Sequence, residues 1–193
     1  MLGGARLDIV LDVIVTVVSL SVIAQYAWSL RRHFVSVTMP VGTMVISAIV
    51  TLTALFFVFL LWIEARPVLA ITLGLLIELC GLWLFWAAIS ASRKARLKMA
   101  FDLGNPRGLV TSGPYRYLRH PFYTSYLIFW VGWAIATWSI WSLLPLAVIT
   151  VIYVLAALDE ERKFSRTEMA GDYAAYRAQT GFFWPRLPGF DNR

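Results

Sequence analysis

The chain has 193 residues, of which 60% are hydrophobic and 15% charged, and its formal net charge is +6. A soluble domain carries about 25% charged residues, so this composition excludes an ordinary soluble enzyme and indicates one integral membrane domain over residues 1–193. The basic residues cluster at the ends of apolar stretches without a nucleic-acid-binding motif, which predicts contact with a lipid bilayer and no nucleic-acid partner.

Three apolar stretches fill the first half of the chain, over residues 9–30, 41–62 and 68–91. Each is long enough for a transmembrane helix, which takes about 20 residues. Asp12 interrupts the first stretch and Glu78 the third. A carboxylate inside a membrane span costs at least about 2.5 kcal/mol unless it is paired, protonated or in a polar cavity. Glu78 is therefore a functional candidate, and the alternative is a hydrogen bond from the neutral acid to a neighbouring helix.

An uncharged stretch over residues 122–158 is too long for one crossing, because a single helix of this length would span about 56 Å against a hydrocarbon core of about 30 Å. We expect a helical hairpin with its turn near residues 137–145. The fold class is then an all-α, polytopic membrane bundle of about five transmembrane helices, three in residues 1–91 and two in the C-terminal half, residues 92–193. The positive-inside rule places the N-terminus outside and the C-terminus in the cytoplasm, and we expect a multi-pass protein of a bacterial inner membrane.

The polar tail begins at Asp159 and reads as one helix through about Gln179, which the Thr180-Gly181 pair would end. Three aromatic residues, 182–184, follow. Because such a triplet is costly in water, we expect it to pack back on the membrane domain or to line a pocket there.

The string GPYRYLRHPFY, residues 113–123, stands where the hairpin begins. Pro121 suits the first turn of a helix, which makes His120 its N-cap. Free N–H groups at a helix start attract anionic ligand groups, so the string is a candidate binding site. The alternative is that its arginine, histidine and tyrosine side chains are ordinary membrane-interface anchors.

The hairpin predicts a second part of this site. Both ends of a hairpin emerge on the same face, so Glu160 and Glu161, after the second hairpin helix, should lie near His120 and Tyr123. An ion pair between the acidic cluster and Arg116 or Arg119 is a compatible alternative.

These features together resemble the isoprenylcysteine carboxyl methyltransferase and phospholipid methyltransferase superfamily. The resemblance covers residues 102–187 and includes the motif, the hairpin, the glutamate pair, a Tyr-x-x-Tyr spacing and a closing aromatic-proline segment. It implies S-adenosylmethionine as cofactor, bound in a pocket at the cytoplasmic face, and a lipophilic methyl acceptor in the membrane. The cofactor-binding residues that it implies are Leu109, Gly113, Tyr115, His120, Tyr123, Glu160, Glu161 and Tyr176.

Two further residues are the catalytic candidates. Arg119 suits the carboxylate of the methyl donor. Carboxyl-methylating members often carry an arginine shortly before the glutamate pair, whereas residues 153–158 here contain no cation, and Glu78 or Asp12 could replace that polar group. This departure leaves the acceptor open between an isoprenylcysteine-like carboxylate, a lipid amine, a thiol and another small apolar molecule.

Two other functions stay open at this point. One is an NADPH-dependent membrane reductase similar to sterol reductases, although these favour asparagine at the position of Phe122. The other is a non-enzymatic membrane scaffold. No metal site is expected, because Cys80 is the only cysteine and cannot build a zinc cluster. The oligomeric state is left open.

Overall fold

The computed structural model describes residues 2–33, 41–93 and 109–186, and every regular element in these ranges is helical. The elements are α1 (Leu2–His33), α2 (Val41–Ile63), α3 (Val68–Ser92), η2 (Gly113–Arg116), α4 (Pro121–Thr137), η3 (Ile140–Ser142), α5 (Leu143–Phe164) and α6 (Ala170–Gln179), where η marks a 3₁₀ turn. This confirms the predicted all-α class.

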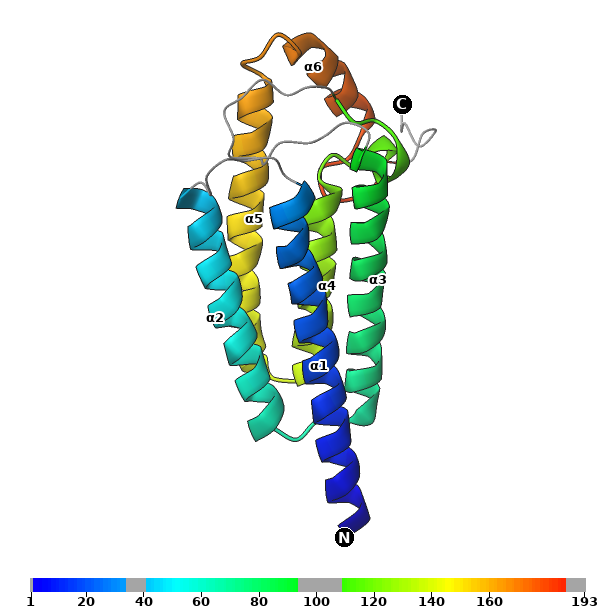
Figure 1. Ribbon diagram of the computed structural model, residues 1–193, viewed down its shortest axis with the longest axis vertical. Helices are drawn as coiled ribbons and strands as arrows, with labels where there is room; N and C mark the ends of the chain where they lie inside the picture. Colours follow the sequence, from blue (N-terminus) through cyan, green and yellow to red (C-terminus); the bar gives the residue numbers. More distant parts are fainter. Residues whose placement is uncertain (1, 34–40, 94–108, 187–193) are drawn as a thin grey trace.

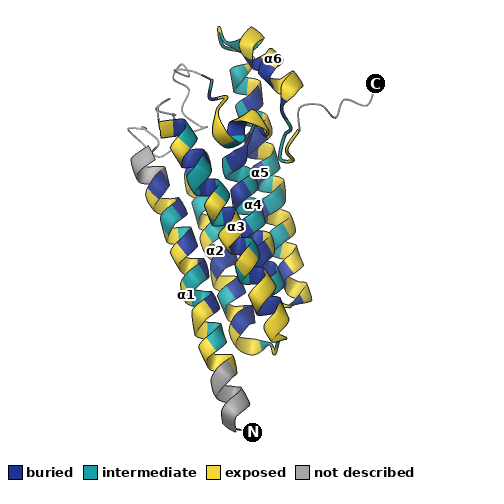
Figure 2. Ribbon diagram, turned by 90° about the vertical axis from the view of Figure 1, so that its right-hand side faces the viewer, coloured by how far each residue is buried: buried dark blue, intermediate teal, exposed yellow. Residues whose placement is uncertain are grey.

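The five long helices, α1 to α5, lie side by side in a bundle, and α6 lies across one end of it (Figure 1). Among the described residues, α1, α2, α3 and α5 each contain a segment long and apolar enough to cross a membrane. The 17-residue α4 is shorter and packs against α3, α5 and α2. The outer faces of the bundle carry many exposed residues (Figure 2), among them large apolar side chains such as Trp83 and Leu69. This pattern suits contact with lipid and confirms a membrane bundle.

The turn of the predicted hairpin lies at the end of the bundle far from α6 (Figure 1). Helix α4 ends at Thr137, and Trp138 takes a left-handed conformation with φ 52°. The hydroxyl of Ser139 then donates a hydrogen bond of 2.8 Å to Glu64, at the end of α2. At the same end, Asp12 of α1 is paired with Arg66. The intramembrane carboxylate at position 12 thus has a cationic partner.

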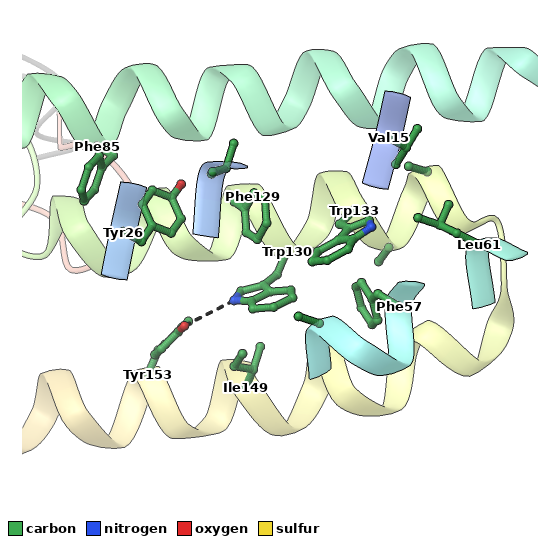
Figure 3. Packing of buried hydrophobic residues seen from close by; sticks show 14 of the residues in the cluster. Val15, Tyr26, Phe57, Leu61, Phe85, Phe129, Trp130, Trp133, Ile149 and Tyr153 are labelled. Carbon is green, nitrogen blue, oxygen red and sulfur yellow. Dashed lines mark hydrogen bonds between the residues drawn. The ribbon is translucent and has the colours of Figure 1, made fainter. Parts of the chain in front are cut away.

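The interior of the bundle is aromatic. Trp130 and Trp133 of α4 stack with their ring centroids 5.6 Å apart, and Phe57 of α2 meets both edge-on (Figure 3). Trp130 donates a hydrogen bond of 3.3 Å from its ring nitrogen to the Tyr153 hydroxyl on α5. Large buried rings of this kind favour a unique packing of α2 and α5 on the central α4.

Helices α3 and α4 approach closely because small residues face each other. A Cβ placed on Gly132 would lie 2.7 Å from the Gly74 carbonyl oxygen and 2.7 Å from the backbone nitrogen of Glu78. Small residues at membrane helix contacts let backbones meet in this way. Glu78 is buried at this contact. The Ser19 hydroxyl of α1 lies 3.0 and 2.9 Å from the two carboxylate oxygens of Glu78. Glu78 therefore makes the interhelical hydrogen bond that was the alternative to a functional role.

The single tail helix that we expected from Asp159 to Gln179 is wrong. Helix α5 ends at Phe164, and α6 begins at Ala170. In the interval the Thr167 hydroxyl donates 2.8 Å to the Phe164 carbonyl, a local bond that competes with a continuing helix. The break lets α6 turn back, so that the Phe164 ring stacks on Tyr173 with centroids 4.9 Å apart.

Candidate active site

The start of α4 presents His120 at the end of the bundle that α6 covers. Gly113 has φ +60°, and a Cβ there would lie 2.9 Å from the Cβ of Ala91, so glycine suits both the backbone and the space. The η2 turn that follows leads into Arg119 and His120, and Pro121 begins the helix. His120 is the N-cap residue, but its side chain makes no capping bond and is directed to α5 instead.

Glu161 is the centre of an ionic cluster at this point. Its Oε1 accepts a hydrogen bond of 2.7 Å from Arg119 Nε and lies 3.2 Å from His120 Nε2. Its Oε2 lies 3.7 Å from Arg177 Nε, on α6. The carboxylate is 6% exposed. The predicted meeting of the two hairpin ends is therefore confirmed, and so is the compatible ion pair to Arg119.

Glu160 has a different environment from its neighbour. Its one ion-pair contact among the described residues is the 3.8 Å separation between its Oε2 and His120 Nδ1, and its side chain is 29% exposed. Asp159, one residue earlier, is paired with Lys163 at 2.7 Å on the helix surface. Of the three consecutive acids, Glu160 is thus the one whose charge is least engaged.

Aromatic rings surround the imidazole of His120. The centroids of Phe182, Tyr123 and Phe183 lie 4.9, 5.9 and 6.0 Å from that of His120. Our expectation that the aromatic triplet packs back on the bundle is confirmed for Phe182 and Phe183. It is wrong for Trp184, which is 85% exposed.

Backbone hydrogen bonds hold the segment after α6 against the motif at residues 113–123. Arg119 N donates 2.8 Å to the Gly181 carbonyl, and Gly181 N donates 3.0 Å to the Tyr117 carbonyl. The Arg119 guanidinium also donates to the carbonyls of Thr180 and, at 3.2 Å, Arg177. Most of the hydrogen-bonding capacity of Arg119 therefore serves to hold the tail and Glu161, which favours a positioning role over a catalytic one.

Tyr115 and Tyr176 join the same two segments. The Tyr176 hydroxyl donates 2.7 Å to the Tyr115 carbonyl. Burial raises the pKa of both phenols, so both stay neutral and the Tyr176 hydroxyl remains a donor. Tyr115 packs against Phe122, with centroids 6.5 Å apart, and Leu109 lies half-buried just before this turn. These residues support the shape of the site next to the ionic cluster.

Glu78 does not lie with the other candidates. Its backbone packs against Gly132, which is twelve residues along α4 from His120, or about 18 Å at helical rise. The structure thus brings together the candidates at positions 119, 120, 123, 160 and 161 and leaves Glu78 deep in the bundle.

Two contributions escaped the sequence. Arg177 was not a candidate, although it follows Tyr176 in a stretch read as helical, and its contact with Glu161 depends on the break between α5 and α6. Tyr153 was not a candidate either, and its ring centroid lies 5.8 Å from that of Tyr123 and 5.6 Å from that of Tyr126. Tyr153 lies about two helical turns before Glu160, and that spacing was the available signal.

A protein-family model described as phospholipid methyltransferase matches residues 69–168, just over half of the chain. The matched segment runs from α3 to the break after α5 and contains the motif, the hairpin and both glutamates. No curated protein matches the chain.

Proposed function

Because the chain belongs to the phospholipid methyltransferase family, whose members are membrane methyltransferases for lipid-type substrates, we propose that S-adenosylmethionine is its methyl donor and a lipid amine its methyl acceptor. The observation that carries this proposal is the difference in environment between the two adjacent glutamates at the end of the hairpin. Glu161 is paired with Arg119 and lies 3.7 Å from Arg177, whereas Glu160 beside it is 29% exposed and contacts His120, whose ring lies next to that of Tyr123.

The side chains at this end suit the chemistry of the donor. S-adenosylmethionine, when bound, supplies an electrophilic methyl group on a sulfonium, and it also carries an ammonium and a carboxylate. Glu160 would hold the ammonium. The rings of Tyr123 and Phe182 would attract the sulfonium by cation–π interaction. The positive dipole end of α4 would attract the carboxylate, and His120, which lies between Glu160 and Glu161, would orient the two glutamates.

The other residues of the proposed pocket act by position. Gly113 and Tyr115 belong to the turn that the resemblance places over the nucleoside together with the preceding Leu109, and Tyr176 of α6 donates a hydrogen bond to that turn. Arg119 and Glu161 hold the tail against the start of α4. Holding the reactants in line and excluding water would supply most of the catalysis, because methyl transfer is a direct displacement.

The charge arrangement favours an amine acceptor over a carboxylate. Arg119 and Arg177 both lie against Glu161, and the nearby Lys163 is paired with Asp159. An acceptor carboxylate would have to break one of these pairs and would also meet the negative charge of Glu160. A neutral amine acceptor would leave both pairs of Glu161 intact.

The test is a binding and transfer assay on detergent-purified protein. Calorimetry with S-adenosylmethionine and its demethylated product should show binding, and NADPH should give none. Methyl-labelled donor should transfer label to phosphatidylethanolamine and not to farnesylcysteine. Binding of NADPH alone would favour a reductase, binding of neither cofactor a scaffold, and label on farnesylcysteine alone would refute the amine.

A matched pair of variants separates the proposed pocket from the helix surface. Glu160→Gln should weaken donor binding, whereas Asp159→Asn, which removes a neighbouring surface charge paired with Lys163, should leave it unchanged. Equal losses in both variants would mean that a general field effect, and not a contact from Glu160, attracts the donor.

A further inference from the structure

Trp184 follows the two rings that pack on His120, but its own side chain is 85% exposed. The backbone just before it is held in place, because the Thr124 hydroxyl on the first turns of α4 donates a hydrogen bond of 3.3 Å to the Phe183 carbonyl. The exposed indole therefore has a defined place beside α4. What it contacts depends on the depth of that place relative to the membrane.

Helix α5 indicates where the membrane surface lies. One face of this helix is apolar through Val151, Leu155 and Leu158, which are 55%, 60% and 36% exposed. About one turn later the same face carries the exposed Arg162. Apolar side chains face the hydrocarbon and basic side chains mark its edge. The boundary on α5 therefore lies between Leu158 and Arg162, at the level of Glu161.

Thr124 lies on the membrane side of that boundary. His120 Nε2 lies 3.2 Å from Glu161 Oε1, so the start of α4 is level with the boundary. Thr124 is about one helical turn deeper, and it shares its face of α4 with Val131, which is 39% exposed about two turns further on. Trp184 adjoins the carbonyl that Thr124 binds. The indole therefore begins at the depth of the membrane interface, on a face of α4 that looks toward lipid.

Three other exposed residues lie around this position. Tyr117 is 36% exposed, and the backbone nitrogen of the exposed Arg186 donates 2.9 Å to the Tyr117 carbonyl. The exposed Arg116 precedes it, with its guanidinium 6.0 Å from the Tyr117 ring centroid. Tryptophan and tyrosine are enriched at membrane interfaces, and arginines there meet anionic headgroups. The composition of this surface thus suits a bilayer.

We propose that Arg116, Tyr117, Trp184 and Arg186 form a membrane-docking surface, at which the Trp184 indole inserts among the lipid headgroups and the two arginines contact lipid phosphates. Because Phe182 and Phe183 directly precede the docked indole, docking holds their rings against His120. The bilayer thus helps to close the candidate site. This inference goes beyond the proposed function and holds for any donor or acceptor.

Spin labelling tests where position 184 lies. Cys80 is the only cysteine, so a nitroxide can be attached to Trp184→Cys or, as the matched control, to Asp172→Cys on the exposed side of α6, each combined with Cys80→Ser. The proteins are placed in nanodiscs of phosphatidylcholine and phosphatidylglycerol. Oxygen partitions into the bilayer, whereas a nickel chelate stays in water. The ratio of relaxation by oxygen to relaxation by the chelate should be severalfold higher at position 184 than at position 172. Equal ratios overturn the proposal, and so does a label at 184 that is shielded from both reagents, as in a protein contact.

Proteolysis in the same nanodiscs tests whether docking holds the rings. Chymotrypsin can cut after Phe182 or Phe183 when these rings leave His120. Trp184→Ala should be cut there about fivefold faster than the wild type, because cleavage follows the population of the locally open form. Trp141→Ala is the matched control, since this indole is 64% exposed at the end of the bundle far from α6, and it should be cut at the wild-type rate (Figure 1). Equal rates in Trp184→Ala and the wild type, or the same acceleration in both variants, overturn the proposal.

Discussion

The same substitution at the two adjacent glutamates of α5 should affect two different properties, stability at one position and donor affinity at the other. Glu161→Gln removes the charge that Arg119, His120 and Arg177 share. Glu160→Gln removes a charge with a single distant ion-pair contact at 3.8 Å. We expect the first variant to lose stability and the second to lose donor affinity while staying folded.

The magnitudes follow from burial and distance. Glu161 and Arg119 are 6% and 10% exposed, and removing one partner of a buried pair costs about 3–5 kcal/mol. Glutamine keeps one carbonyl oxygen for Arg119, so we expect about 2–3 kcal/mol, or a Tm lower by about 5–10 °C for a chain of this length. Glu160→Gln should change stability by less than about 0.5 kcal/mol. One charge-assisted contact to the donor is worth about 1.5–3 kcal/mol, which corresponds to a Kd raised about 10- to 100-fold.

The assay is thermal unfolding in detergent, followed by tryptophan fluorescence, together with calorimetric titration of S-adenosylmethionine. Limited proteolysis adds a local readout, because loss of the Arg119 contact should expose the segment after α6. The reasoning is refuted if Glu160→Gln is the less stable variant, or if Glu161→Gln is fully stable and Glu160→Gln binds the donor as tightly as the wild type.

Substitutions at four other positions test the proposed packing and site. Glu78→Gln should be nearly neutral for stability, because the amide still bonds Ser19, whereas Glu78→Ala should cost about 1–2 kcal/mol. Lost turnover in a stable Glu78→Gln variant would restore a catalytic role for Glu78. Gly132→Leu should lower Tm strongly or prevent folding, since its Cβ has no room, whereas Gly171→Ala on α6, with nothing within 4 Å, should be neutral or slightly stabilising. Tyr176→Phe loses a hydrogen bond of 2.7 Å, so it should lower the free energy of unfolding by about 1 kcal/mol and weaken donor binding. Unchanged Tm and Kd would show that this bond does not hold the tail.

The parts of the site that were predictable depend on chain connectivity alone. An uncharged stretch too long for one crossing must double back, and a doubled-back helix pair returns its two ends to the same face. Connectivity alone therefore predicts that His120 lies near Glu161, and in the structure His120 Nε2 lies 3.2 Å from Glu161 Oε1. The functional role of these residues stays a prediction.

The parts that were not predictable depend on how separate helices are rotated against one another. Glu78 could be recognised as costly in lipid, but its partner Ser19 is 59 positions away, and no local pattern selects it. The break between α5 and α6 follows from hydroxyl-to-backbone bonds in a stretch with ordinary helix composition, and Arg177 meets Glu161 because of that break.

The division of the chain by the family match has a mechanistic consequence. The matched residues, 69–168, supply the charges and rings proposed for the donor, namely His120, Glu160 and Glu161. Two described contacts come from outside this range: the Tyr26 ring of α1 lies 4.7 Å from that of Tyr126, and Arg177 of α6 lies 3.7 Å from Glu161. The tail faces the ionic cluster, where the donor would bind, whereas α1 faces the deeper aromatic layer, where only a membrane-borne molecule would lie. If donor binding belongs to the shared part, acceptor preference should follow α1, and exchanging α1 between two family members should transfer acceptor preference without changing the affinity for the donor.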